Sequence, residues 1–367
     1  MDALPWLCGW IGINLAKCRF DIKLPNFLTR PGEPGVKHRV ISPINHLILS
    51  VKSLNHMRQK WSQTITERAR SYWTQERTRQ LLGDKKLPLL PGEAPVLLRA
   101  LGLLKADASL PPERMRKYRQ INHMLAAVRP ALRELAATHR RVDLVDAGCG
   151  RSYMTMLVGW WFRQQGVPVR ILGIDRDDKI IGQCRRRVEA AGLDDIVRLV
   201  AADLQVDLGA VWERAFGQPL GPLHGLFALH ACDTATDDAI VLAVAHRAAF
   251  IAVAPCCQAE LAAAWARRQQ EDPGSPMMPL WGSPHLRRTA AATMTDTYRL
   301  LVLRACGYEA SATEFVEAVH TPKNTLIRAT RRNEGDATAA RRYWDLCAVL
   351  GGVGIGLGER LLSSGSG

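Results

Sequence analysis

The chain has 367 residues, of which 47% are hydrophobic, so it can bury a sizeable core as one large domain with additions or as two domains. Its 49 Lys and Arg against 35 Asp and Glu give a formal net charge of +14, which favours a polyanionic partner, nucleic acid first and an anionic membrane surface second. Nine cysteines without a regular disulfide framework argue against a disulfide-stabilised secreted protein, and a reduced cytoplasm is the expected compartment.

Residues 1–51 are predicted to be an irregular extension, because prolines and glycines interrupt every periodic pattern in them. The apolar stretch at 3–16 contains two glycines and ends at Lys17. It is too short to cross a bilayer, so no membrane association is expected. No function is assigned to this extension.

Residues 52–140 are predicted to form a small basic helical domain, with helical regions at 52–82 and 112–137. The first region mixes cations with two indoles, Trp61 and Trp73. Such a surface could hold a phosphate backbone and stack a base. The alternative is an ordinary amphipathic helix whose tryptophans belong to the core.

The most informative stretch runs from Val142 to Tyr153 and reads VDLVDAGCGRSY. An apolar run that ends in Asp146 is typical of a buried parallel strand, and the small residues after it indicate a tight strand-to-helix turn. Gly148 and Gly150 let the backbone turn sharply and approach a ligand. The following helix offers free amide donors at its N-terminus. These groups suit a cofactor that carries an amine, a carboxylate and a ribose.

Strands and helices alternate from here on, which predicts an α/β fold with a doubly wound, Rossmann-like parallel sheet. Helices are expected at about 153–165 and 179–191. An antiparallel hairpin at 308–319 and 324–330 is expected to close the sheet. The predicted domain covers residues 141–332, and a helical tail covers 333–367. The predicted parallel strands are 142–146, 170–174, 197–201, 223–229 and 249–253.

Three acids stand at the tips of three successive predicted strands: Asp146, Asp175 and Asp203. In an open parallel sheet, ligands bind in the crevice at the carboxyl ends of the strands. One such acid is explained as a helix N-cap, but three in a row after a glycine-rich turn are harder to explain in that way. They indicate a cofactor site.

This order of motifs resembles the class I S-adenosylmethionine-dependent methyltransferases. The resemblance implies that the turn glycines approach the methionine part, that the second-strand acid binds the ribose hydroxyls, and that the third-strand acid faces the adenine. NAD dehydrogenases share the first motif, but the antiparallel ending fits a methyltransferase better. One departure is that Arg151-Ser152-Tyr153 stands where the third glycine is usual. By this resemblance Gly148, Gly150, Asp175 and Asp203 take these roles. The full set of candidate cofactor-binding residues is Asp146, Gly148, Gly150, Tyr153, Asp175, Asp203 and His230.

Two later stretches follow predicted strands four and five: HACDTATD at 230–237 and PCCQ at 255–258. Together they resemble a methyltransferase subfamily with His-x-Cys-x-x-x-Thr-Asp and Cys-Cys motifs, which includes a tRNA 2′-O-methyltransferase. The run TPKN at 321–324 also looks like that subfamily's hairpin. The chain departs from the tRNA enzyme because it lacks that enzyme's zinc-finger segments, and Gln258 stands in place of a His. RNA is therefore implied only as a substrate class.

Four residues are the candidates for catalysis: His230, Asp233, Cys256 and Cys257. His230 or Asp233 could accept a proton from a hydroxyl or amine acceptor, although His230 could instead cap the next helix. A thiolate at Cys256 could act as a nucleophile. A zinc site with His230 and Cys232 is disfavoured because adjacent cysteines are poor partners in a tetrahedral site, so no metal is expected. Small buried cysteines that pack beneath the substrate are a further alternative.

The sequence thus predicts an S-adenosylmethionine-dependent methyltransferase that acts on RNA. Its rivals are a non-catalytic nucleic-acid-binding protein that keeps the fold, and a methyltransferase for proteins or small molecules.

Overall fold

The computed structural model describes residues 43–83, 86–229, 233–255, 258–314 and 325–363, with side chains from residue 56 onward. The chain divides into two compact units, residues 1–68 and 69–367. The described part of the first unit belongs to helix α2 (Pro43–Tyr72), whose last turn lies in the second unit. The domain boundaries expected at 52, 141 and 333 stay a prediction.

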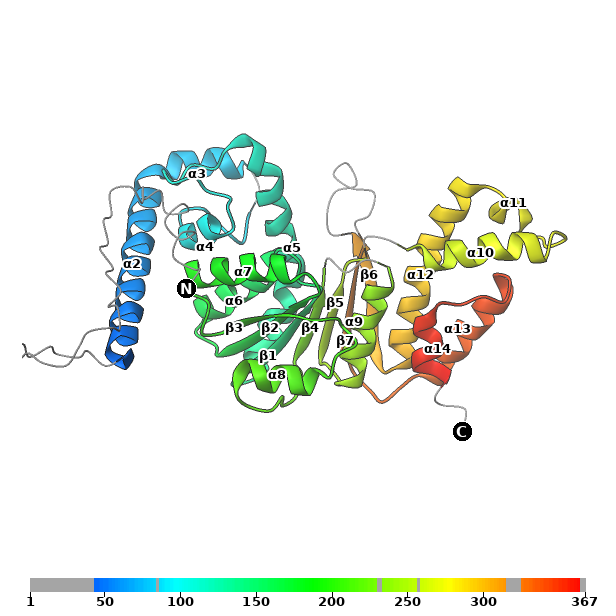
Figure 1. Cartoon of the computed structure of the whole chain (residues 1–367). Coiled ribbons are helices and arrows are strands. Elements are labelled where there is room, and N and C mark those ends of the chain that lie inside the picture. The colour runs from blue at the N-terminus through cyan, green and yellow to red at the C-terminus, as the bar shows by residue number, and fades with distance from the viewer. Residues whose placement is uncertain (1–42, 84–85, 230–232, 256–257, 315–324, 364–367) are drawn as a thin grey trace, which may run out of the picture. The chain divides into compact units, whose positions relative to one another are not determined.

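A seven-stranded sheet forms the centre of the second unit, in the order β3-β2-β1-β4-β5-β7-β6 (Figure 1). β1 to β5 are parallel, and β7 is antiparallel to both β5 and β6. The predicted parallel sheet with an antiparallel closing hairpin is therefore confirmed. The strands are β1 (Val142–Ala147), β2 (Val169–Asp175), β3 (Val197–Ala201), β4 (Gly225–Ala228), β5 (Phe250–Val253), β6 (Tyr308–Glu314) and β7 (Thr325–Arg331).

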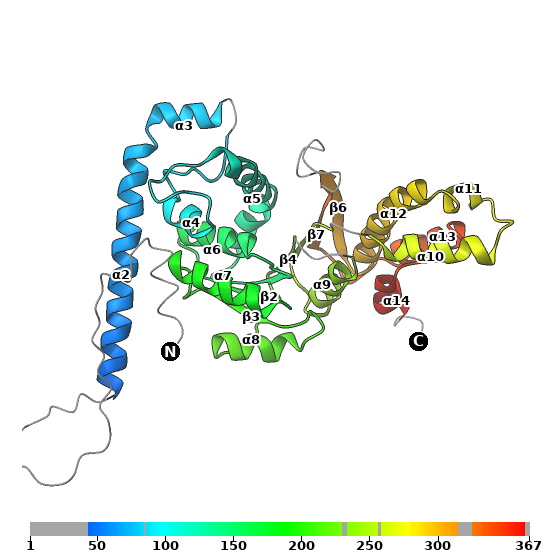
Figure 2. The ribbon, with the colours of Figure 1, turned by 45° about the horizontal axis from the view of Figure 1, so that its top comes forward.

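Helices cover both faces of the sheet, which explains why the inner strands read as continuous apolar runs (Figures 1 and 2). One face packs against α5 (Pro112–Thr138), α6 (Tyr153–Gln165) and α7 (Asp178–Ala190). The other packs against α8 (Leu208–Phe216), α9 (Thr234–Ala245) and α12 (Pro284–Ala305). The helices expected at 153–165 and 179–191 are α6 and α7.

The acid near the amino end of the first strand is paired. Asp143 is 1% exposed, and the Arg170 guanidinium of β2 donates to both of its carboxylate oxygens, from Nε at 2.8 Å and from Nη2 at 2.7 Å. Such a two-point contact satisfies a buried carboxylate well. Asp143 lies near the amino end of β1, so this pair belongs to the opposite edge of the sheet from the strand tips.

The helical region predicted at 52–82 is two helices, because Thr74 begins a new one, α3 (Gln75–Leu82), by accepting a hydrogen bond from the Arg77 amide. A short helix that the sequence did not indicate, α4 (Pro95–Ala100), follows. The indole of Trp73 packs against the core and donates to the Ala108 carbonyl at 2.9 Å. The structure therefore supports the core alternative for this tryptophan.

The remaining helices gather beside β6 and β7. α10 (Glu260–Glu271), α11 (Met278–Trp281), α13 (Ala337–Val349) and α14 (Gly356–Leu362) lie around α12. The rings of Tyr298 on α12 and Tyr343 on α13 are 5.1 Å apart, and the Tyr343 hydroxyl donates to the Ile355 carbonyl. The helices expected at 333–367 are thus part of the core.

The strand order indicates where on the sheet a ligand would bind. From β1 the chain steps outward to β2 and β3, then returns across the sheet to β4 on the other side of β1. In open parallel sheets, ligands bind outside the carboxyl ends of the strands at this reversal. The turn after β1 and the segments after β4 and β5 therefore share one edge.

Among the described helices, none has the length and apolar character needed to cross a membrane.

Candidate active site

The turn after β1 takes a conformation that favours glycine. Gly148 and Gly150 have φ angles of +66° and +51°, and Ser152 has +55°. Left-handed backbone is uncommon for a residue with a side chain. Ser152 is fully buried and stands where the third glycine of the family pattern is missing. The turn therefore keeps a glycine-like backbone at this departure from the pattern.

The turn is fixed to the neighbouring strand. The Cys149 amide donates to the Ile174 carbonyl of β2 at 2.9 Å. A side chain at Gly173 would meet a Leu199 carbon at 2.5 Å and the Cys149 sulfur at 3.2 Å, so glycine leaves room for the thiol. Burial raises the pKa of Cys149. This cysteine therefore packs as a small neutral group and is no nucleophile.

The acid at the tip of β2 is held by two backbone amides. Asp175 Oδ2 accepts from the Gly150 amide at 2.8 Å, and Oδ1 accepts from the Asp177 amide at 3.0 Å. Each carboxylate oxygen can accept more than one hydrogen bond. The carboxylate is thus oriented beside the turn and retains acceptor capacity for a diol.

The other predicted cofactor residues lie around the same turn. Asp203 is exposed at the tip of β3, where Oδ1 accepts from the Gln205 amide at 3.0 Å. Tyr153 is half-buried at the start of α6, with the Lys117 ammonium 4.4 Å from its ring centre. Burial and nearby Arg151 lower the pKa of Lys117. His230 lies outside the described residues.

Asp146, at the tip of β1, is almost fully buried. Its carboxylate accepts a hydrogen bond from the Thr155 hydroxyl in the first turn of α6. Burial raises its pKa to about 7, Thr155 opposes that rise, and Asp175 adds to it. Asp146 thus joins β1 to the helix that begins at the turn. Its contact with a cofactor stays a prediction.

These groups fit S-adenosylmethionine. The left-handed turn would let the backbone approach the cofactor, Asp175 would offer oriented oxygens to the ribose hydroxyls, and exposed Asp203 would accept from the adenine amine. Asp146 adds a carboxyl group whose charge suits an amine. When bound, the cofactor supplies a methyl group on a sulfonium sulfur.

A second cluster lies after β4 and β5. His230, Cys232, Cys256 and Cys257 fall outside the described residues. Asp233 has a φ of +49°, which is strained for a residue with a side chain. Its Oδ1 accepts from the Ala259 amide at 2.9 Å, so the segment after β4 is fastened to the segment after β5.

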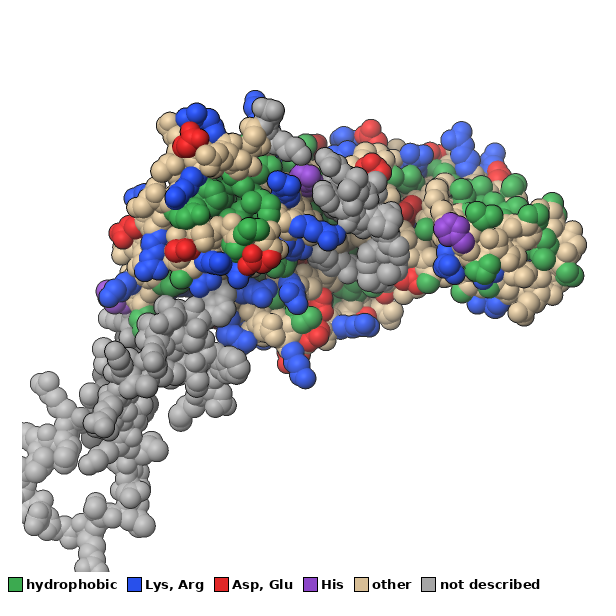
Figure 3. Space-filling view, turned by 90° about the horizontal axis from the view of Figure 1, so that it is seen from above, with side chains coloured by type: hydrophobic (Ala, Val, Ile, Leu, Met, Phe, Trp, Pro, Cys, Tyr) green, Lys and Arg blue, Asp and Glu red, His purple; other side chains and the backbone are tan. Residues whose placement is uncertain are grey.

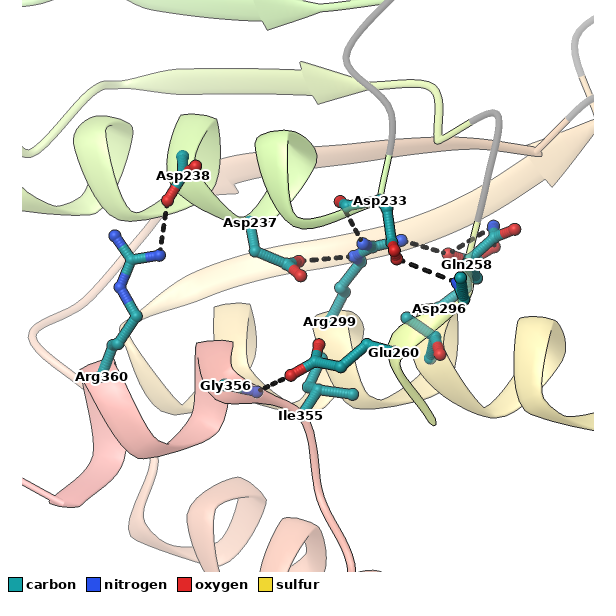
Figure 4. A network of polar contacts seen from close by, with 12 residues as sticks. Asp233, Asp237, Asp238, Gln258, Glu260, Asp296, Arg299, Ile355, Gly356 and Arg360 are labelled. Atoms are coloured by element: carbon teal, nitrogen blue, oxygen red, sulfur yellow. Dashed lines mark hydrogen bonds and ion pairs between the residues drawn. The ribbon is translucent and has the colours of Figure 1, made fainter. Parts of the chain in front are cut away.

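A buried arginine on α12 holds this second cluster (Figure 4). Arg299 is 0% exposed and donates from Nε to Asp237 at 2.7 Å, from Nη1 to Asp296 at 3.0 Å, and from Nη2 to the Asp233 carbonyl at 3.0 Å. Burial raises the pKa of both carboxyl groups, and the guanidinium opposes that rise. Although burial works against its charge, the two carboxylates raise the pKa of Arg299. We call Asp233, Asp237, Asp296 and Arg299 the arginine network.

Other groups extend the arginine network to both sides. The Gln258 amide donates to Asp296 at 3.2 Å, so the residue after the paired cysteines is held as well. Glu260 accepts from the Gly356 amide of α14 at 2.8 Å, and burial raises its pKa. Figure 4 shows these side chains converging from α9 and α10, from the segments that lead into those two helices, and from α12, with the Gly356 amide of α14 beside Glu260.

Sequence reasoning did not identify the residues that organise this cluster. Asp237 entered only as the last letter of a motif, and Arg299 and Asp296 did not enter at all. One signal was present: Arg299 stands in an otherwise apolar turn of a helix, three residues after an acid. A charge in that position is seldom buried unless it is paired.

No group of three or more His, Cys, Asp or Glu side chains within the described ranges could hold a metal ion. Because His230 and the neighbouring cysteines lie outside those ranges, the expectation of no metal stays a prediction.

Comparison with known proteins agrees with the geometry. Residues 116–264 match a family model described as a methyltransferase domain. The chain carries an S-adenosylmethionine-dependent methyltransferase domain. S-adenosylmethionine is accordingly its cofactor. The match begins in α5 and ends in α10, so it includes the turn after β1 and the tips of β4 and β5.

Solved structures are similar at low identity. The methyltransferase domain of METTL16 is 11% identical with a TM-score of 0.38, over 65% of this chain and 78% of that one. The S-adenosylhomocysteine-bound methyltransferase PaMTH1 from Podospora anserina is 13% identical with a TM-score of 0.36, over 65% and 88%. An O-methyltransferase from Bacillus cereus is 14% identical with a TM-score of 0.35, over 69% and 96%. A search of curated proteins found no match.

Proposed function

We propose that the protein transfers the methyl group of S-adenosylmethionine to RNA. The observation that carries the choice of RNA is a set of uncommitted cations beside the cofactor turn. Arg151, Arg176 and Lys179 are exposed there, and their side chains make no ion pair or hydrogen bond with any described residue. Cations without protein partners suit the phosphates of a polyanion.

The charge of the whole chain supports the same substrate. The net charge is +14, and Figure 3, which looks down on the edge where the parallel strands end, shows Lys and Arg side chains spread over this face. The resemblance of the segments after β4 and β5 to a subfamily with an RNA-modifying member adds to this choice. The cytoplasm is the compartment that the cysteine usage favours.

The chain's own residues would contribute positioning and proton removal. An RNA hydroxyl or amine must lose a proton as it accepts a methyl group, and Asp233 and His230 are the proposed bases. Asp233 Oδ1 is occupied by the Ala259 amide, while its second carboxylate oxygen has no hydrogen-bond partner in the described part of the chain. Cys256 and Cys257 are proposed to pack beneath the acceptor, with a thiolate role as the alternative. Most of the rate enhancement would come from alignment of acceptor and cofactor.

A non-catalytic binding protein is the second candidate, and one observation weighs against it. Ser152 keeps a left-handed backbone although a side chain disfavours it. Such strain persists when the surrounding structure over-determines it and often accompanies a working site.

The experiment is incubation of the purified protein with methyl-labelled S-adenosylmethionine, total cellular RNA and, separately, a protein extract. We expect label in RNA. The variant Arg151→Gln/Arg176→Gln/Lys179→Gln should lower kcat/KM for RNA at least tenfold and flatten its salt dependence. Label in protein alone would overturn the choice of RNA, and absence of any transfer would favour the binding protein.

A further inference from the structure

A pocket of about 350 Å³ lies between α5 and α6, away from the cofactor turn. It is lined by Pro88, Glu93, Arg129, Arg133, Trp160, Trp161, Gln164 and Gln165. Because α6 starts at the turn with Tyr153 and rises 1.5 Å per residue, Trp160 lies roughly 10 Å and Gln164 roughly 16 Å along the helix from that start. A ligand in the pocket is therefore not at the methyl acceptor position.

The lining combines indole rings with free cations. Trp161 is 6% exposed and packs in the core, whereas its neighbour Trp160 is half-buried and leaves part of its surface at the pocket. Arg129 and Arg133 are four residues apart and so share one side of α5. Neither guanidinium has an ion pair or hydrogen bond within the described ranges. The two free cations outnumber the one carboxylate of the lining, Glu93. Beside an indole they form a binding surface for a phosphate and a flat ring.

The part of the lining that Pro88 contributes is held against α5 by buried hydrogen bonds. The Leu89 amide donates to the Asn122 side chain at 2.9 Å, and the Tyr118 hydroxyl donates to the Leu89 carbonyl at 2.6 Å. Asn122 and Tyr118 are fully buried on α5. Pro88 precedes Leu89 in the chain and lines the pocket, so these hydrogen bonds fix its position there. A site that is formed before binding loses less entropy when the ligand arrives.

We propose that this pocket binds one unpaired nucleotide of the RNA substrate, distant from the methylated one. The base stacks on Trp160, the phosphates contact Arg129 and Arg133, and the amides of Gln164 and Gln165 reach the base edge. This inference rests on the proposed RNA substrate. A nucleotide is favoured over an acidic peptide because an indole that can stack on a base lines the pocket together with side-chain amides that both donate and accept. The base must be unpaired, since a paired base does not offer its face to an indole.

The test compares Trp160→Leu and Arg129→Gln/Arg133→Gln with the control Arg341→Gln/Arg342→Gln. The control removes two exposed charges from α13, where the two arginines likewise make no ion pair or hydrogen bond with described residues. Dissociation constants are measured by fluorescence anisotropy for a mixed-sequence single-stranded RNA and for its duplex, and by calorimetry for S-adenosylmethionine.

We expect Trp160→Leu to weaken the binding of single-stranded RNA about tenfold, within the range for loss of one stacked base. The affinities for duplex RNA and for the cofactor should not change. The arginine pair should weaken single-stranded RNA more than the control pair does. The proposal would be overturned if a pocket variant lost the same affinity for single-stranded and duplex RNA. It would also be overturned if the two arginine pairs lost the same affinity for single-stranded RNA. If the wild type labels no RNA, the proposed function fails, whereas labelled RNA with unchanged affinities in the pocket variants refutes this inference alone.

Discussion

The acids at the tips of β2 and β3 accept hydrogen bonds from backbone amides, and the acid at the tip of β1 accepts one from a nearby hydroxyl. The polar groups after β4 and β5 are held by a buried arginine instead. In the first region, which we call the cofactor half, Asp175 accepts from amides at Gly150 and Asp177. In the second, the acceptor half, Arg299 ties Asp237 and Asp296 to the Asp233 carbonyl. The cofactor half is a local structure, while the acceptor half depends on a helix more than sixty residues further along the chain.

This difference predicts how substitutions in each half affect binding and stability. Loss of one group from the cofactor half removes an acceptor from a turn that its other hydrogen bonds still support, so the fold should survive. Loss of the arginine leaves two buried carboxylates without a counter-charge. Substitutions in the two halves should therefore separate binding from stability.

The largest effect is expected from Arg299→Met, which removes the buried cation and leaves Asp237 and Asp296 unpaired. Breaking a buried pair by removing one partner costs about 3–5 kcal/mol. We expect urea unfolding to show a loss of about 4 kcal/mol. The matched control is Arg360→Met, because Arg360 is 41% exposed and pairs with Asp238 at 2.7 Å; it should cost about 1 kcal/mol or less.

The triple change Asp237→Asn/Asp296→Asn/Arg299→Met sharpens this prediction. Removing the acids together with the cation should recover part of the stability lost in Arg299→Met, because no uncompensated charge then stays buried. A triple variant less stable than the single one would show that packing by the arginine side chain, and not charge balance, supports the acceptor half.

The same contrast explains what the sequence could predict. The turn VDAGCGRSY is contiguous, so its glycines and acids indicated a strand, a turn and a cofactor at once, and β1, β2 and the hairpin of β6 and β7 lie where they were expected. Arg299 meets Asp237 and the Asp233 carbonyl across sixty or more residues of chain, although Asp296 is only three residues away. The periodicity of a sequence does not show which helix places a charged side chain beside which strand tip. The arginine network could therefore not be predicted.

The second effect is on the cofactor. Asp175→Ala removes the oriented carboxylate and should weaken the binding of S-adenosylmethionine on the order of 100-fold, because hydrogen bonds to a charged acceptor contribute about 1.5–3 kcal/mol each. Calorimetric titration measures the loss. Asp207→Ala is the matched control: Asp207 caps α8 by accepting from the Ala210 amide and should affect stability only. Retained affinity in Asp175→Ala would contradict the assignment of the cofactor half.

The third effect is on turnover. If Asp233 removes the acceptor's proton, Asp233→Asn should lower kcat on the order of 100-fold, at the low end of the range for a general base. The asparagine oxygen can still accept from the Ala259 amide, so the melting temperature and the affinity for S-adenosylmethionine should change little. A lowered melting temperature with kcat unchanged would mean that Asp233 only fastens the two strand tips together.

The smallest effect is a pH dependence of cofactor affinity, which comes from Asp146. Burial raises the pKa of this carboxyl to about 7 from the ordinary 3.8, with Asp175 adding to the rise and Thr155 opposing it. Asp146 is therefore mostly neutral at pH 6 and mostly charged at pH 8, and the charged form attracts the cationic cofactor. The affinity for S-adenosylmethionine should rise as the pH rises through 7, by about tenfold at most, since one partly screened charge contact contributes about 1.4 kcal/mol. The variant Asp146→Asn cannot ionise and should show a flat profile from pH 6 to 8 in the same titrations. An unchanged slope in that variant would assign the pH dependence to another group and leave Asp146 with only its hydrogen bond to α6.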